Sequence, residues 1–348
     1  MARVVVGFSG GVDSTTSALF LMGQGYEVVG VTLVVSSSWS ESNIEHAKQA
    51  AMELGIEHRV VDCRKEFKSL VITPYLEEIA LGITASPCPL CNQEFKFAKL
   101  FQVADEMNCE FIATGHYART VEDDGIRYIA RWNETFKDQS YMLYRLAPEL
   151  VARLLFPLAM MSTKGDVRNL ASDNKLSVAT RADSQGLCFA PDGVQAFLEH
   201  HLTSVARFGE IVDTNGRVLG THRGYQYYTL GQRRGLGLVE NKPCFVVSID
   251  RDNNRLVVGD YNLLYRKSAT ISKFILHGKY NQIDSLTQYR LTARPRYSSL
   301  GEAVERVELL SNGSALITFE KETAHLASGQ HLVIYDDNKV VVGGGVIA

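Results

Sequence analysis

Two cysteines in a proline-bounded segment, and a third far along the chain, are the residues of this sequence best suited to chemistry. Cys88 and Cys91 stand three residues apart in "SPCPLCNQEFKF" at 86–97, and Cys188 lies in "DSQGLCF" at 183–189. Such thiols can coordinate a metal, exchange disulfides or act as nucleophiles. A helix is predicted to begin near Asn92, and its N-terminus would favour the thiolate form of both neighbouring cysteines.

Spacing alone leaves these three chemistries open. A structural zinc site needs four ligands, and no second Cys or His pair nearby completes one. A thioredoxin-like redox pair would have no need of Cys188. Cys63, Cys109 and Cys244 stand alone in strand-like or loop-like contexts and are interpreted as small buried hydrophobic residues.

A glycine-rich loop near the N-terminus predicts a nucleotide site. The segment "GFSGGVDS" runs through Gly7, Phe8, Ser9, Gly10, Gly11, Val12, Asp13 and Ser14. Its glycines let backbone amides approach an anion, its serines supply hydroxyl donors, and the following helix N-terminus favours negative charge. It is neither a Walker A loop nor G-x-G-x-x-G. It resembles the pyrophosphate-binding loop of the N-type ATP pyrophosphatases, with Asp13 placed to hold Mg²⁺.

Alternating strands and helices must position these residues. Buried strands are predicted at 3–8, 27–35, 58–63 and 110–116, and helices at 13–25, 41–55 and 92–107. Continuous β-branched strands that alternate with helices predict a doubly wound parallel sheet, and ligands of such sheets bind at the carboxyl ends of the strands. "ATGH" at 113–116 ends one of those strands, where an adenosine could lie.

The chain changes character near residue 205. Short alternating strands separated by Gly, Asn and Asp follow, with turn signals in "DTNGR" and "DRDNNR". We therefore predict an α/β catalytic domain at 1–205, a small β-rich domain at 206–265 and a C-terminal β-barrel at 266–348.

The overall composition is that of a soluble globular protein. Of 348 residues, 45% are hydrophobic and 22% charged, and the net charge of −3 argues against RNA binding over the whole surface. The N-terminus lacks the pattern of a signal peptide and no apolar run is long enough to span a membrane, so a cytoplasmic location without a membrane partner is predicted.

Eight motifs in order resemble the bacterial tRNA-specific 2-thiouridylase (MnmA) family over essentially the whole chain. They are "GFSGGVDS", "CPLCNQEFKF", "ATGHYA", "KDQSYML", "DSQGLCF", "THRGYQYYTLGQRRGLG", "ARPRY" and the closing "SGQHLVIY…VVGGGVI". The resemblance implies an enzyme that uses ATP to adenylate the 2-carbonyl of the wobble uridine of tRNA and then replaces that oxygen with sulfur. The donor would be sulfide, or a sulfur-carrier protein or cysteine desulfurase.

The same resemblance assigns roles to individual positions. Residues 7–14 would hold ATP, with Leu33 and Gly115 beside the adenosine. Cys91 matches the usual nucleophile and Cys188 the usual persulfide carrier. The target base would lie against Ser86, Pro87 and Cys88, and the positions that match tRNA contacts are His116, Lys137, Asp138, Gln139, Arg296, Tyr297 and Gln330.

One departure from the family pattern concerns Cys88, where many members carry aspartate. A third thiol adds a soft ligand and a competing disulfide partner. Two routes therefore remain. Cys188 could carry a persulfide that Cys91 resolves, or Cys88, Cys91 and Cys188 could hold a four-iron four-sulfur cluster whose fourth iron binds sulfide. We favour the cluster from the sequence.

Two other functions compete with thiolation. An amidating or lysidine-forming ligase of the pyrophosphatase group would not need Cys91 and Cys188. A non-catalytic RNA-binding protein with a redox-sensing metal site would not release pyrophosphate from ATP in a tRNA-dependent way.

Overall fold

The computed structural model describes residues 1–36, 41–132, 137–182, 186–203, 205–238, 244–324 and 326–348. Residues 183–185 of the "DSQGLCF" motif therefore lie outside the described residues. The chain forms two compact units. Unit 1 contains Met1–Ile72, Cys88–Pro191 and Lys339–Val341, and unit 2 contains Thr73–Pro87, Asp192–Asn338 and Val342–Ala348.

Unit 1 is built on a parallel sheet. Its strands, in the order β3-β2-β1-β4-β7, are Glu57–Asp62, Glu27–Val34, Arg3–Gly7, Phe111–Thr114 and Leu154–Leu155. All four neighbouring pairs run parallel. This confirms the parallel α/β prediction, and β7 joins the sheet as a short strand that the sequence did not predict.

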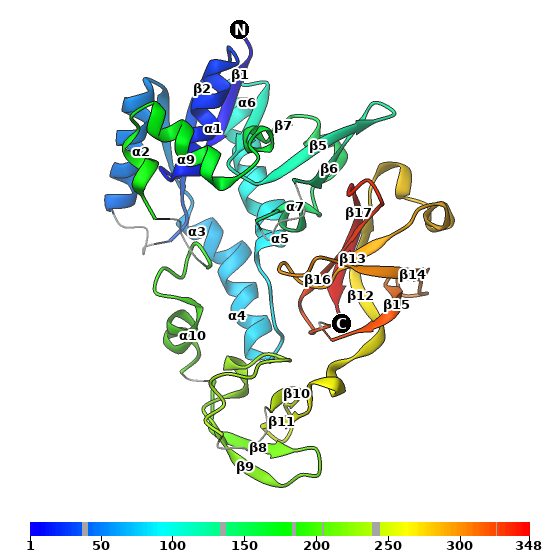
Figure 1. Ribbon diagram of the computed structural model, residues 1–348. Coiled ribbons are helices and arrows are strands. Elements are labelled where there is room, and N and C mark those ends of the chain that lie inside the picture. Colours follow the sequence, from blue (N-terminus) through cyan, green and yellow to red (C-terminus); the bar gives the residue numbers. More distant parts are fainter. Residues whose placement is uncertain (37–40, 133–136, 183–185, 204, 239–243, 325) are drawn as a thin grey trace. The chain divides into compact units, whose positions relative to one another are not determined.

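Helices cover both faces of this sheet, as alternation along β1 shows. Val4 and Val6 share a buried core with residues of α1 (Val12–Gly23), α2 (Glu41–Leu54) and α9 (Lys164–Asp173), while a side chain at Gly7 would meet Leu100 of α6 (Phe97–Glu106). Figure 1 shows α1, α2, α9 and α6 around the strands β1 and β2. The sheet is therefore doubly wound.

The helix that follows the cysteine pair begins earlier than predicted. It starts at Cys88 as α5 (Cys88–Cys91), continues through a π-helical segment η2 (Asn92–Lys96) and becomes α6. In the π-helical segment the Phe97 amide donates to the Asn92 carbonyl, five residues back. The Asn92 side chain donates to the Met142 carbonyl at 2.8 Å and so ties this segment to α7 (Ser140–Leu143).

The rest of unit 1 completes the α/β domain. It comprises a hairpin of β5 (Ala118–Asp123) and β6 (Ile126–Arg131), the helices α3 (Arg64–Phe67) and α8 (Pro148–Val151), the π-helical segment η1 (Lys68–Ile72), and the 3₁₀ turns η3 (Pro157–Met160) and η4 (Ser177–Thr180).

Unit 2 begins with two helices and a small sheet. The helices are α4 (Thr73–Ala80) and α10 (Val194–Leu202), and the sheet order β10-β11-β8-β9 contains Phe245–Asp250, Arg255–Gly259, Gly209–Asp213 and Val218–His222. The turns predicted at "DTNGR" and "DRDNNR" join antiparallel neighbours, which confirms them. Its 3₁₀ turns are η5 (Tyr225–Tyr227) and η6 (Tyr261–Leu264).

A closed barrel completes unit 2, as predicted. Its order β12-β15-β14-β13-β16-β17 contains Arg266–Leu276, Ala315–Thr323, Glu302–Leu309, Thr292–Arg294, His331–Tyr335 and Val341–Ile347, with the 3₁₀ turns η7 (Gly278–Tyr280) and η8 (Ile283–Gln288) before β13. Among the described residues no helix combines the length and the apolarity needed to cross a membrane.

Candidate active site

A pocket of about 320 Å³ opens at the carboxyl ends of the unit 1 strands. This is the edge at which parallel sheets bind ligands. The predicted site residues that line it are Gly7, Phe8, Ser9, Asp13, Ser14, Leu33, Cys91, Gly115, His116, Gln139 and Cys188. One cavity thus brings the glycine-rich loop, the strand ends and two of the three cysteines together.

The glycine-rich loop folds around its two serines. The Ser9 amide donates to the Ser14 hydroxyl at 3.1 Å, and that hydroxyl donates to the Gly11 carbonyl at 3.2 Å. The Ser9 hydroxyl accepts from the Gly11 amide at 3.4 Å. The Arg181 guanidinium also holds the loop. Its Nη1 donates to the Gly10 carbonyl at 3.0 Å, and its Nη2 donates to the Asn43 Oδ1 at 3.0 Å. A loop held in this way presents amides and hydroxyls to a phosphate.

Two glycines are required here by close approach. Gly10 has φ +68°, and a Cβ there would lie 2.6 Å from the Ala47 nitrogen of α2. A Cβ on Gly115 would lie 2.9 Å from the Asp13 carbonyl carbon and 3.0 Å from the Ser14 nitrogen. The end of β4 can therefore pack against the start of α1 only without a side chain at residue 115.

Asp13 is already engaged by two partners. Its Oδ1 accepts from the Tyr117 hydroxyl at 2.6 Å and from the Lys164 ammonium at 2.6 Å, and Lys164 lies 5.6 Å from the centre of the Tyr117 ring. The sequence had suggested Asp13 as a Mg²⁺ ligand. In this arrangement a protein cation occupies that oxygen, and Lys164 and Tyr117 are functional candidates that motif spacing did not reveal.

Leu33 and His116 give another part of the pocket lining a character that suits a base. Leu33 reaches it from β2, and His116 follows β4. The His116 ring stacks on Phe97 with a centroid separation of 5.9 Å, and its Nδ1 is 2.7 Å from the Thr114 hydroxyl. Burial, assisted by the positive charge of Lys96, lowers the pKa of His116 well below its usual value, so this imidazole is neutral at pH 7.

Aromatic packing brings the two distant cysteine segments to the same wall. Phe189, next to Cys188, packs on Phe67 with a centroid separation of 5.7 Å, and Phe67 packs edge-on against Phe95 at 5.0 Å. Phe95 lies four residues after Cys91. This cluster explains why thiols 97 residues apart in sequence line one cavity.

The prediction of favoured thiolates is wrong. Burial raises the pKa of Cys91 to about 12, and it also raises the pKa values of Cys88 and Cys188. The helix begins at Cys88, so Cys91 lies buried inside the helix instead of ahead of it. Desolvation therefore outweighs the helix terminus, and the thiols are protonated at neutral pH.

Lys96 is the cation that opposes this effect. It is the leading influence that lowers the pKa of each of the three thiols, and it lines the pocket together with Cys91 and Cys188. Residues five apart lie on different sides of an α-helix, but a π-helical turn brings them close to the same side. The turn Asn92–Lys96 thus places Lys96 near Cys91, and the residue pattern gave no sign of this turn.

An iron–sulfur cluster on three cysteines is not supported. Within the described ranges, which include Cys88, Cys91 and Cys188, no group of three or more His, Cys, Asp or Glu side chains is arranged to hold a metal ion. Cys91 and Cys188 line the pocket, whereas Cys88 is not among its lining residues. As they stand, these three thiols do not form such a group.

The "KDQ" residues have different environments. Lys137 is exposed. The Asp138 side chain is completely buried, where it accepts from the Trp132 amide at 2.9 Å and the Ser140 hydroxyl at 2.9 Å. Gln139 lines the pocket and accepts from the Tyr117 amide at 2.9 Å. Asp138 therefore organises this turn and has no side-chain surface to offer RNA.

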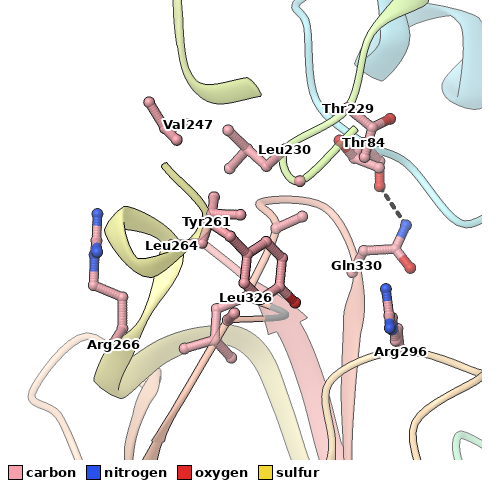
Figure 2. A pocket seen from close by; sticks show the side chains of 13 residues that line it. Thr84, Thr229, Leu230, Val247, Tyr261, Leu264, Arg266, Arg296, Leu326 and Gln330 are labelled. Atoms are coloured by element: carbon pink, nitrogen blue, oxygen red, sulfur yellow. Dashed lines mark hydrogen bonds between the residues drawn. The ribbon is translucent and has the colours of Figure 1, made fainter. Parts of the chain in front are cut away.

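The remaining predicted substrate residues belong to unit 2. Ser86 and Pro87 precede the unit boundary, and the Ser86 carbonyl is 3.0 Å from the His331 Nε2. Arg296 and Gln330 line a separate pocket within unit 2, in which the Gln330 side chain donates to the Thr84 carbonyl at 2.8 Å (Figure 2). Tyr297 is half-buried, and its carbonyl accepts a hydrogen bond from the buried Arg294.

Family models match the chain from end to end. Residues 2–192 match the tRNA methyl transferase HUP domain, residues 195–260 the tRNA methyl transferase PRC-barrel domain, and residues 266–347 the aminomethyltransferase β-barrel domain.

Curated relatives match over their full lengths. The chain is 41% identical over 350 residues to "tRNA-specific 2-thiouridylase MnmA 2" of Fusobacterium nucleatum, with 100% of both chains covered. It is 39% identical to the MnmA of Syntrophotalea carbinolica, covering 99% of this chain and 98% of that one.

Among solved structures, a 4-thiouridine synthetase–RNA complex with bound ATP matches 59% of this chain and 51% of that chain at 15% identity, with a TM-score of 0.39, too low to support a conclusion. The sequence matches are decisive by themselves: the chain belongs to the family of tRNA-specific 2-thiouridylases named MnmA.

Proposed function

We propose that this protein is an ATP-dependent tRNA-uridine 2-sulfurtransferase that thiolates the wobble uridine. The observation that carries the proposal is a single pocket that contains both a phosphate-binding loop and the thiols of Cys91 and Cys188. An ATP-dependent ligase of the same group would need the first feature and not the second. Family membership supports the same reaction.

Activation of the carbonyl is the first half of the reaction. The loop from Gly7 to Ser14 would bind the phosphates of ATP, and Leu33 and Gly115, which line the same pocket, would contact the adenosine. The uridine O2 attacks the α-phosphorus and pyrophosphate leaves. The resulting adenylate turns O2 into part of a good leaving group, AMP. Mg²⁺ would enter with ATP, because the Asp13 Oδ1 is bound to Lys164 without it.

Sulfur transfer is the second half, and we propose the persulfide route. Cys188 would carry the extra sulfur from a persulfide donor, and its terminal sulfur attacks C2 as AMP departs. Cys91 then attacks the Cys188 sulfur while its thiol proton passes to N3 of the uridine. The S–S bond to the transferred sulfur breaks, and the electron pair of that bond goes to the transferred sulfur, which is left as C2=S. A Cys91–Cys188 disulfide remains, and an external thiol must reduce it.

Two features support this route over the cluster that we favoured from the sequence. Cys91 and Cys188 share the pocket wall, as an exchanging pair requires. The described residues provide no metal-binding group, and Cys88 lies off the pocket lining. Cys88 would then act as a neighbour of the base site without a redox role.

The catalytic test is thiolation of a tRNA transcript, with 2-thiouridine measured by mass spectrometry in the presence of ATP and a persulfide donor. We expect Cys91→Ser and Cys188→Ser each to lose activity by about a thousandfold or more, because nucleophiles that act as a unit fail together. Cys109→Ala, at a buried cysteine away from the pocket lining, should keep wild-type activity. Full thiolation activity in both serine variants would remove these cysteines from the reaction, whereas tRNA-dependent release of pyrophosphate without any 2-thiouridine would support a ligase.

Iron content separates the two sulfur routes. We expect protein reconstituted under anaerobic conditions to bind no stoichiometric iron, and Cys88→Ser to retain most thiolation activity. About four irons per chain, together with thiolation from inorganic sulfide alone, would overturn the persulfide route and restore the cluster.

Recognition of the tRNA by Ser86–Cys88, His116, Lys137, Gln139, Arg296, Tyr297 and Gln330 is proposed on the family resemblance. The domain limits at 205 and 265, the cytoplasmic location and the identity of the sulfur donor likewise stay predictions.

A further inference from the structure

A second pocket, of about 310 Å³, lies wholly within unit 2. This volume is within the range of small-ligand sites. Six separate parts of unit 2 line it. They are Thr84, the turn Thr229–Gly231, Val247 of β10, the segment from η6 into β12, the barrel loop that carries Arg296, and a last group made of Ala324, Leu326, Ala327 and Gln330. Figure 2 shows their side chains converging on one space.

The wall of this pocket is apolar, with one aromatic ring at its centre. Leu230, Val247, Leu264 and Leu326 line it, and Figure 2 shows the Tyr261 ring in their midst. Two neighbouring aromatic rings pack against Tyr261 and fix its orientation. Phe245 lies 4.9 Å away at 60°, and Tyr265 meets it edge-on at 5.8 Å. A ring held in this way is prepared to stack on a flat ligand.

Two arginines lie on opposite sides of that ring, Arg266 on one side and Arg296 on the other (Figure 2). Arg266 is fixed at the rim because its Nη1 donates to the Leu263 carbonyl at 2.7 Å and the Tyr265 carbonyl at 2.8 Å. The described lining residues include no carboxylate. In a chain of net charge −3, this pocket is locally positive.

We propose that this pocket binds one unstacked nucleotide of the RNA substrate, other than the uridine that reacts, with its base on Tyr261 and its flanking phosphates at Arg266 and Arg296. The proposal rests on tRNA being the substrate. It adds Tyr261 and Arg266 to the tRNA-contacting positions that the family resemblance gave.

The paired arginines favour a nucleotide within a strand over a free mononucleotide. A nucleotide in a strand has phosphates on both its 5′ and 3′ sides, and single-stranded RNA is bound by aromatic stacking combined with cations along the backbone. A free mononucleotide carries its phosphates on one side only.

The test is the affinity of the full-length protein for a fluorescently labelled anticodon stem-loop RNA, measured by anisotropy without ATP or sulfur donor. We expect Tyr261→Leu to weaken binding by about fivefold to about 150-fold, the range for loss of one stacked base, and Tyr261→Phe to bind like wild type. Phe208→Leu is the control, since Phe208 is an exposed aromatic residue of unit 2 outside the pocket lining.

A second variant tests the role of the arginine charges. It leaves Tyr261 in place, so an effect of the Tyr261 substitution on folding cannot influence its result. We expect Arg266→Met to weaken binding and to reduce the slope of log affinity against log salt by about one, as the loss of one phosphate contact does. Lys267→Met removes a neighbouring charge that is paired with Glu305, and it should leave the slope unchanged. Wild-type affinity in both Tyr261→Leu and Arg266→Met would overturn the proposal.

Two further outcomes identify what fails. If AMP binds the wild type, and Tyr261→Leu abolishes this while RNA affinity stays constant, the pocket holds a free nucleotide and our proposal is wrong. If the wild type binds RNA as described but thiolates no tRNA, the proposed function fails and the pocket assignment stands.

Discussion

The two pockets hold their polar groups in opposite ways. The unit 1 pocket uses backbone amides, the buried thiol of Cys91 and side chains that are coupled to one another, such as Asp13 with Tyr117 and Lys164. The unit 2 pocket places exposed guanidinium groups around an apolar wall. We propose that the unit 1 pocket changes the reactivity of its substrates, whereas the unit 2 pocket only binds a nucleotide. Buried, coupled groups should respond strongly to substitution and exposed groups weakly.

The largest effect is expected at Asp138. Its buried carboxylate accepts hydrogen bonds from Trp132 and Ser140 and lies 3.8 Å from the buried Arg131. Asp138→Ala removes the acceptor of both hydrogen bonds and the buried carboxylate beside Arg131, so the unfolding free energy of unit 1 should fall by about 3–5 kcal/mol. Urea unfolding followed by fluorescence measures this, with Asp138→Asn as the milder variant. A loss below about 1 kcal/mol would contradict the comparison.

The next effect is steric and concerns ATP. In Gly115→Ala the new methyl group would lie within about 3 Å of the Asp13 backbone and the Ser14 nitrogen, which forces the phosphate loop to move. Misplacing such a loop should weaken ATP binding by about tenfold or more. Calorimetric titration with ATP measures the dissociation constant. Gly23→Ala, with open space around its Cβ position, is the control and should bind ATP normally.

A smaller effect is expected at Lys96. Its charge lowers the pKa values of Cys91 and Cys188, which burial has raised, so Lys96→Met raises them further. Less thiolate is then present at any pH below these pKa values, and alkylation by iodoacetamide should slow and shift its profile to higher pH. Peptide mapping reports each cysteine separately. Lys96→Arg should retain the wild-type alkylation profile. Lys99→Met should also retain it for Cys91 and Cys188, because the wild-type Lys99 ammonium pairs with Glu66. Unchanged alkylation in Lys96→Met would remove Lys96 from the site.

The smallest effect is expected at an exposed ion pair of unit 2. The Arg255 Nε lies 2.8 Å from the Glu210 carboxylate, and both side chains are more than 40% exposed. Arg255→Met should change the unfolding free energy of unit 2 by no more than about 1 kcal/mol, because solvent screens such pairs. Thermal unfolding at low and high salt measures it. A loss as large as that of Asp138→Ala would break the contrast between the units.

Local sequence signals predicted unit 1 well. The β-branched runs of β1 and β2 and the glycine-rich loop are contiguous in sequence, so the parallel sheet and the phosphate loop could be recognised from them. The start of α5 could not, because Pro87 and Pro89 suggested a loop and packing of Asn92 against α7 is a tertiary effect. The thiolate prediction was wrong for the same reason, since burial is not visible in spacing.

The unit 2 pocket lay beyond sequence reasoning. Its lining runs from Thr84 to Gln330, and those residues meet only once the barrel closes. The family resemblance predicted Arg296 and Gln330 as tRNA contacts, whereas Tyr261 and Arg266 belong to no motif. Short strands with turn residues predict a barrel, but not which loops face each other.

The π-helical turn at Asn92–Lys96 makes the spacing between Cys91 and Lys96 intolerant of insertions and deletions. Each residue added to or removed from a helix rotates everything beyond it by about 100°. Removing one residue from this turn would restore an ordinary α-helix, yet it would swing either the thiol or the ammonium out of the pocket. We therefore expect chain length in this segment to matter more than the identity of its exposed residue Glu94.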